Sequence, residues 1–139
     1  MNAFWWAACA AVIWGIVPLF EKVGLSSTPP TVAIFARSLG IIAGFIVFGV
    51  WWSPWRQLWN ISVRSFVLLA LGGFLASFVG QIAFYNALRE GHVSQVTPVA
   101  GTYPLVAALL GWLFLREPIT TGRLCGVALI VLGAVLMRQ

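Results

Sequence analysis

Residues 93–115 read VSQVTPVAGTYPLVAALLGWLFL, a run of 23 residues without a charged side chain. A helix needs about 20 mostly apolar residues to cross the ~30 Å hydrocarbon core of a bilayer. Backbone polar groups cannot stay unpaired in lipid, so a lone segment of this kind must be helical there. The run therefore predicts a transmembrane helix, and it indicates that the rest of the chain folds in a membrane as well.

The same pattern recurs along the chain, with short polar connections between the apolar runs. It predicts an all-α integral membrane protein with five transmembrane helices in one domain, over residues 3–20, 30–52, 66–88, 93–115 and 119–137. The connection between the second and third runs differs, because Ser53-Pro54 can start a helix and tryptophans recur every four residues at Trp51, Trp55 and Trp59. We expect a short helix there, lying in the headgroup layer.

Composition supports a lipid environment. Of the 139 residues, 61% are hydrophobic and 8% are charged, whereas a soluble domain has about 25% charged residues. The net charge of +5 does not point to nucleic acid, because no basic cluster with interleaved aromatic residues is present. We expect a multi-pass protein of the cell membrane, in contact with lipids and without a nucleic-acid partner.

The charges at the helix ends do not choose an orientation. The face that holds the N-terminus would carry four arginines: Arg56, Arg64, Arg116 and Arg123. The opposite face would carry Lys22, Arg89 and Arg138, with Arg37 one to two turns inside the membrane. This difference is too small for the positive-inside rule to act on. Either the chain inserts with its N-terminus inside and weak discrimination, or it inserts both ways and pairs as an antiparallel homodimer.

Small residues form rows at intervals of four on several runs, which lets membrane helices approach closely. The fifth run carries Gly122, Gly126 and then Gly133, and its interior has no other polar feature. Tight packing within one bundle is the simplest interpretation of such rows. If one of them forms a dimer contact, we expect it to be this one.

The third run has the most polar helical face. Ser77, Gln81 and Tyr85 recur every four residues, and Asn86 lies beside them. Polar groups within a span are costly and usually face the bundle or a water-filled cavity. These side chains are therefore candidates for substrate contact, although hydrogen bonding between helices would also explain them.

The fourth run contains two prolines six residues apart, Pro98 and Pro104, with Thr97 and Tyr103 just before them. Proline cannot donate a backbone hydrogen bond, so each one frees a carbonyl and bends the helix. Bent or broken helices at mid-membrane often line transport sites. We expect this bend to face the same cavity as the polar side of the third run.

The first run adds Trp14, Pro18, Glu21 and Lys22, which share one helical face. Our hypothesis is that the first, third and fourth runs converge on one substrate cavity. Arg37 has three possible roles: its side chain could reach the headgroups, pair with Glu21, or join Lys22 in binding an anionic group.

His92 and Glu117 lie at helix ends, where a capping or interface role is expected. The remaining motifs argue against catalysis. There is no carboxylate pair within a span, no G-x-S-x-G, no H-E-x-x-H and no phosphate-binding glycine loop. Cys9 and Cys125 lack a metal-binding spacing. The sequence therefore predicts a protein that is not an enzyme and holds no cofactor or metal.

Several short motifs together resemble an EamA domain. They are WGIVP at 14–18 followed by Glu21-Lys22, ARS at 36–38, FYNAL at 84–88, LREPI at 115–119 and GVALIVLG at 126–133. The resemblance covers nearly the whole chain and implies the drug/metabolite transporter superfamily. Many members carry two such domains as inverted repeats with ten helices, and this chain resembles a single five-helix unit.

The resemblance also bears on the substrate. The small multidrug resistance relatives carry a glutamate in the middle of the first helix, whereas residues 10–17 here contain no carboxylate. An anionic or zwitterionic metabolite fits Lys22 and Arg37 better than a lipophilic cation. We expect a subunit that moves a small metabolite by alternating access as a homodimer. The alternatives are a flippase for a lipid-linked headgroup, and a membrane subunit that binds a partner without transporting.

Overall fold

The computed structural model describes residues 2–52 and 55–137, and all regular elements among them are helical. This confirms the all-α class. In chain order the elements are α1 (Ala3–Gly24), α2 (Pro30–Trp52), α3 (Trp55–Leu58), α4 (Val63–Phe74), the π-helical turn η1 (Leu75–Val79), α5 (Gly80–Glu90), α6 (Val93–Ala100), α7 (Tyr103–Leu115) and α8 (Thr121–Leu136).

Four helical stretches are long and apolar enough to cross a membrane. They are Ala3–Gly24, Pro30–Trp51, Val63–Glu90 and Val93–Leu115, and they confirm a multi-pass membrane protein. Helix α8 is also apolar but has 16 residues, which corresponds to about 24 Å at ~1.5 Å per residue. That is shorter than the ~30 Å hydrocarbon core, so the fifth span stays a prediction.

Two helix boundaries differ from the expected ones. Helix α1 continues past Lys22 to Gly24, because Glu and Lys are good helix formers; their charge marks the edge of the membrane and not the end of the helix. The third run begins at Val63, where the Ser62 hydroxyl accepts a hydrogen bond from the Ser65 N–H at 3.1 Å. This N-cap starts the helix three residues before the expected position, residue 66.

The connection between α2 and α4 contains one helical turn, α3. The expected helix start at Ser53-Pro54 lies outside the described residues. Trp51 and Trp59 are 89% and 88% exposed, so neither indole packs on the protein. An interfacial position for α3 stays a prediction. The exposed indoles are compatible with it, because tryptophan prefers the headgroup layer of the membrane.

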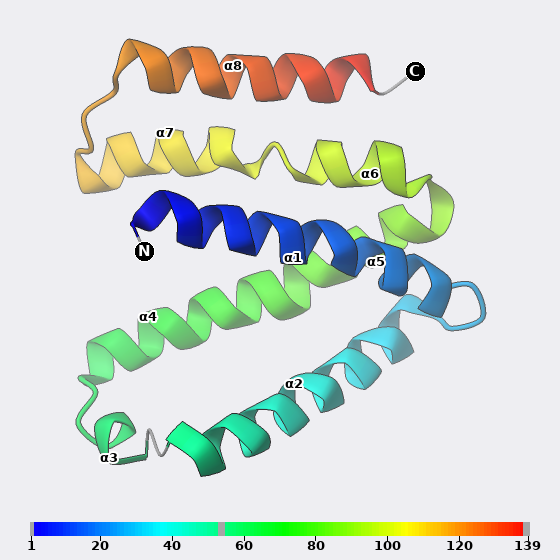
Figure 1. Ribbon diagram of the computed structural model, residues 1–139, viewed down its shortest axis with the longest axis vertical. Coiled ribbons are helices and arrows are strands. Elements are labelled where there is room, and N and C mark those ends of the chain that lie inside the picture. Colours follow the sequence, from blue (N-terminus) through cyan, green and yellow to red (C-terminus); the bar gives the residue numbers. More distant parts are fainter. Residues whose placement is uncertain (1, 53–54, 138–139) are drawn as a thin grey trace. The chain divides into compact units, whose positions relative to one another are not determined.

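The chain divides into two compact units. The first comprises residues 1–22 and 90–139, and the second comprises residues 23–89. In the first unit, α8 packs against both α6 and α7 (Figure 1). In the second unit, α2 and the stretch from α4 to α5 run in opposite directions and are joined through α3 (Figure 1).

Little of the described surface is buried inside the protein. The buried apolar side chains are Leu25, Ile34, Tyr85, Leu88 and Ala134, whereas Phe4, Leu39 and Phe114 are about 70% exposed, as are many others. A protein in water rarely exposes apolar area on this scale. Membrane lipids therefore contact these helices.

The third helical run contains a π turn that the periodicity did not predict. The Gly80 N–H bonds to the Leu75 carbonyl, five residues back. A Cβ atom on Gly80 would lie 3.1 Å from that carbonyl oxygen, so glycine allows the turn to close. A π turn adds about one residue to the α-helical register. Ser77 is consequently displaced from the face that Gln81 and Tyr85 were expected to share with it.

We expect Gly80→Ala to destabilise the protein and Gly73→Ala, in the same helical run, to leave it as stable or more so. A Cβ at Gly73 meets nothing within 4 Å, and alanine is the better helix former. The two variants should differ by about 1 kcal/mol, the scale of modest backbone strain. Thermal unfolding in detergent measures the difference, and equal stabilities would contradict the tight contact at Gly80.

Candidate functional site

The fourth helical run is interrupted between α6 and α7, at Gly101 and Thr102. Pro98 has no N–H for the Ser94 carbonyl, and Pro104 has none for the Ala100 carbonyl. Across the break the bonds span three residues instead of four: the Thr102 N–H bonds to the Val99 carbonyl at 3.2 Å, and the Leu105 N–H bonds to the Thr102 carbonyl at 2.9 Å. The structure thus has two non-helical residues, Gly101 and Thr102, between the two prolines, and the bend expected from the prolines stays a prediction.

A side chain in place of Gly101 would make tight contacts at this break. A Cβ atom on Gly101 would lie 3.1 Å from the Thr97 carbonyl oxygen and 3.2 Å from the Pro98 carbonyl oxygen. Thr102 fits because its hydroxyl donates to the Val99 carbonyl at 2.7 Å. The chain therefore turns tightly here without leaving the Thr102 hydroxyl unpaired.

The Thr97 hydroxyl has a different environment. Its Oγ1 atom is buried, and no hydrogen-bond partner for it is found among the described residues. Buried polar atoms are nearly always paired, and an unpaired one costs about 1–3 kcal/mol. Thr97 lies within α6, one residue before Pro98 and one turn before the break. Its hydroxyl is therefore an unused donor and acceptor close to the break.

Lys22 links α1 to the beginning of α6. Its Nζ donates a hydrogen bond to the Gly91 carbonyl at 2.8 Å. His92 follows directly as the N-cap residue of α6, without a side-chain capping hydrogen bond. The end of α1, with half-buried Glu21 and Lys22, is thus held next to the connection that leads into the interrupted run.

The expected site residues are divided between the two units. The first unit contains eight of them: Trp14, Pro18, Glu21, Lys22, Thr97, Pro98, Tyr103 and Pro104. Pro18 is buried, whereas Trp14 and Tyr103 are 61% and 59% exposed. The Lys22–Gly91 bond joins the α1 group to the α6 connection within this unit.

The second unit contains Arg37, Gln81, Tyr85 and Asn86. Tyr85 is 3% exposed, and Arg37 and Gln81 are half-buried. Asn86 is exposed, and its Nδ2 donates to the Ile82 carbonyl of the same helix at 2.8 Å. Each unit therefore holds its own polar group, and convergence of the two groups on one cavity stays a prediction.

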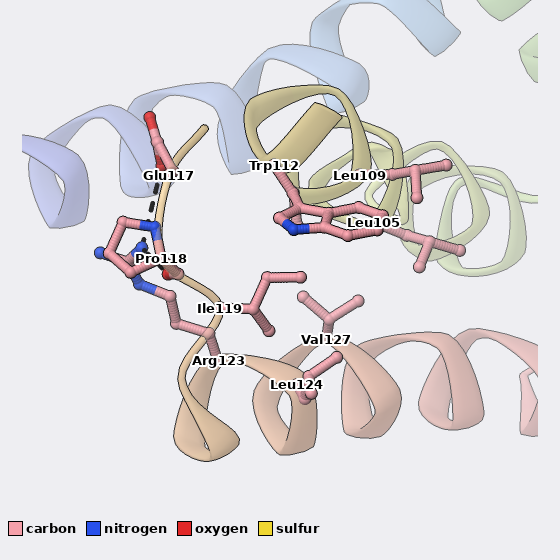
Figure 2. Close-up of a pocket in the computed structure, with 10 residues that line it drawn as sticks. Leu105, Leu109, Trp112, Glu117, Pro118, Ile119, Arg123, Leu124 and Val127 are labelled. Carbon is pink, nitrogen blue, oxygen red and sulfur yellow. Dashed lines mark hydrogen bonds and ion pairs between the residues drawn. The ribbon is translucent and has the colours of Figure 1, made fainter. Parts of the chain in front are cut away.

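A cavity of about 220 Å³ lies between the end of α7 and the beginning of α8. Figure 2 shows its walls: Leu105, Leu109 and Trp112 from α7, and Leu124 and Val127 from α8. Glu117 and Arg123 lie at one end. The Arg123 Nη1 lies 3.8 Å from the Glu117 Oε2 and donates to the Pro118 carbonyl at 3.1 Å. No pattern in the sequence predicted this cavity.

The connection that shapes this cavity depends on an unusual backbone conformation. Arg116 ends α7 with φ 54° and ψ 32°, in the left-handed region that glycine prefers. The next N–H, that of Glu117, then bonds to the Gly111 carbonyl at 3.2 Å. A Cβ atom on Gly111 would lie 3.6 Å from a Glu117 carboxylate oxygen, so the carboxylate lies close over that glycine. Glu117 is an ion-pair partner at a helix end, in line with the expected structural role.

Among the described residues, no cluster of three or more His, Cys, Asp or Glu side chains could hold a metal ion. The polar groups that the described candidate residues offer are hydroxyl, amide, carbonyl and charged groups. Such groups can bind and orient a small polar molecule.

A model described as the EamA-like transporter family matches residues 1–139. An uncharacterized protein of Methanocaldococcus jannaschii is 27% identical over 127 residues, which cover 91% of this chain and 89% of that protein. An uncharacterized transporter of Pseudomonas aeruginosa is 32% identical over 89% of this chain and 42% of its own length. The uncharacterized transporter YojE of Bacillus subtilis is 26% identical over 94% of this chain and 45% of its own length.

This chain therefore spans less than half the length of these two relatives that are named as transporters, and most of the archaeal protein. No solved structure matches the chain.

We expect Thr97→Val to increase the free energy of unfolding by about 1–3 kcal/mol, since valine has a similar shape and removes an unpaired buried hydroxyl. In the matched control Thr102→Val, the free energy of unfolding should fall by about 1 kcal/mol, because the substitution deletes the hydrogen bond to the Val99 carbonyl. Denaturant unfolding in detergent micelles measures both. A destabilised Thr97→Val protein would mean that the hydroxyl has a partner.

Proposed function

The chain belongs to the EamA-like transporter family, and we propose that it moves a small metabolite by alternating access as one subunit of a homodimer. The favoured substrate is anionic or zwitterionic. The family and the apolar helices make it a multi-pass membrane transporter protein. The cell membrane as its location, a single domain over residues 1–139 and five spans are parts of the same proposal.

The observation that carries this proposal is the unpaired Thr97 hydroxyl in α6, one turn before the break between α6 and α7. Interrupted helices in transporters place backbone polar groups beside the substrate. Here the two prolines leave the Ser94 and Ala100 carbonyls without their usual N–H donors. A polar substrate that reaches the break would supply hydrogen-bond partners for these groups and for the hydroxyl. Its binding would then remove the free-energy cost of leaving buried polar groups unpaired in the protein without substrate.

Charge indicates the substrate class. Lys22 lies beside the connection into α6 in the first unit, and Arg37 is half-buried in α2 of the second. Arg37 lies within a membrane-spanning run, where a charge is costly and usually marks a functional position. Carboxylate or phosphate groups are the natural ligands of such cations. The proposed binding set adds Trp14, Pro18, Glu21, Gln81, Tyr85, Asn86, Thr97, Pro98, Tyr103 and Pro104.

One observation on α8 supports pairing of two copies. On α8, Cβ atoms at Gly122, Gly126 and Gly133 would meet nothing within 4 Å. This glycine row is open to another helix, and small residues are what close contact between membrane helices needs.

We expect Thr97→Val and Lys22→Gln each to lower substrate flux at least 10-fold in proteoliposomes, because each removes a group from the proposed site. The assay screens anionic and zwitterionic metabolites, and Gln81→Ala, Tyr85→Ala and Trp14→Ala complete the series. Thr121→Val, an exposed threonine at the start of α8, is the matched control and should transport normally. Unchanged flux in the site variants, together with loss of assembly in Gly126→Leu, would favour a subunit that binds a partner without transporting.

The antiparallel arrangement predicts two orientations in one membrane. Cys9 and Cys125 are exposed and are first replaced by serine, after which Asn60→Cys, in the connection before α4, provides a single label site. Membrane-impermeant maleimide applied to cells, and separately to inverted vesicles, should label comparable fractions. Labelling from one side alone would exclude dual topology and leave a parallel pair.

A further inference from the structure

The cavity between α7 and α8 continues into a longer groove. A second cavity of about 400 Å³ shares Leu105, Leu124 and Val127 with the first and extends along α8 to Val135. We call the two together the α7–α8 groove. Its walls are apolar, and its charged lining residues, Glu117 and Arg123, lie at one end (Figure 2).

The length of the groove along α8 is close to the thickness of the hydrocarbon layer of one bilayer leaflet. Arg123 and Val135 are twelve residues apart on α8, which corresponds to about 18 Å at ~1.5 Å per residue. Half of a ~30 Å hydrocarbon core is about 15 Å. Trp112 lines the charged end, and tryptophan prefers the level of the headgroups. The groove therefore starts at a polar mouth near the interface and points along α8 toward the middle of the membrane.

The residues at the mouth of the groove carry a net positive charge. Residues 116–123 contain two arginines, Arg116 and Arg123, and one acidic residue, Glu117. The Arg123–Glu117 pair is 3.8 Å apart, with side chains 61% and 57% exposed, and exposed ion pairs contribute little to stability. A phosphate can thus compete for the Arg123 guanidinium, whose planar donors suit phosphate oxygens.

We propose that the α7–α8 groove binds an anionic phospholipid of the bilayer. One acyl chain lies between Leu105 and Leu109 of α7 and Leu124 and Val127 of α8, and continues toward Val135. The phosphate lies at the mouth, against Arg123, with Arg116 adding to the positive charge. This ligand matches the apolar wall, the length and the charged end of the groove at the same time.

A helix from a second copy does not fit this groove. A helix with its side chains is about 10–12 Å wide, and helices approach closely in membranes where residues are small. The groove is instead walled mainly by leucine and valine, and the cavity near its mouth holds about 220 Å³. Gly122, Gly126 and Gly133, which were proposed as the dimer contact, do not line either cavity.

The test uses a photoactivatable phosphatidylglycerol with a diazirine on one 16-carbon chain, in vesicles that contain the full chain. Cross-linked peptides are mapped by mass spectrometry. Val127→Trp fills the part of the groove that both cavities share, and Leu129→Trp is the control on the same helix, at a position 68% exposed that does not line the groove. Arg123→Gln tests the headgroup, with photoactivatable phosphatidylcholine as the neutral comparison.

We expect cross-links concentrated on α7 and α8 residues of the groove, reduced at least 5-fold by Val127→Trp and unchanged by Leu129→Trp. Arg123→Gln should remove the preference for phosphatidylglycerol over phosphatidylcholine. Cross-links spread over all helices in proportion to exposure would show ordinary boundary lipid and overturn the proposal. A loss of chemically cross-linked dimer in Val127→Trp, with lipid cross-linking unchanged, would overturn it in favour of a second copy.

Discussion

The requirement that backbone N–H and C=O groups be paired inside lipid governs the structure. It makes each apolar run helical, and it also determines how the helices can be interrupted. At each irregularity a backbone bond with a span other than four residues replaces the α-helical one: Gly80 to Leu75 at the π turn, Thr102 to Val99 at the α6–α7 break, and Glu117 to Gly111 after α7. A glycine lies at each of these places: at Gly80 and Gly101 an added Cβ atom would lie 3.1 Å from a backbone oxygen, whereas at Gly111 the nearest atom would be at an ordinary 3.6 Å.

The membrane character, the helical class and four of the five spans could be predicted from the sequence, since length and hydropathy alone decide them. The break at Pro98 and Pro104 was also predictable, because proline removes a defined hydrogen bond. Helix limits were less so: Glu21 and Lys22 mark the membrane edge while α1 continues to Gly24. The π turn at Leu75–Val79 was not predictable, because it depends on a five-residue pairing that no hydrophobic period records.

The candidate site likewise has a feature that could be predicted in part from the sequence, Thr97, and one that could not, the cavity between α7 and α8. Thr97 was recognisable as a polar residue beside a proline, but its lack of a partner is a property of the packed structure. The Glu117–Arg123 cavity was missed altogether, because it depends on Arg116 adopting a left-handed conformation. An arginine in the sequence does not predict a left-handed conformation, since its side chain does not favour positive φ. The family match and the helices place both features in a membrane transporter protein.

The interruption between α6 and α7 also has a consequence for how the protein enters the membrane. Its run, Val93–Leu115, has a mean hydropathy of 1.6, against 1.9 to 2.1 for the other three long runs. A threonine or a proline in place of a leucine weakens the partitioning of a nascent segment into the bilayer. The residues that make the break polar therefore also make this the least readily inserted of the long segments. The free-energy gain on insertion into the bilayer is smallest for the segment where the substrate is expected to bind.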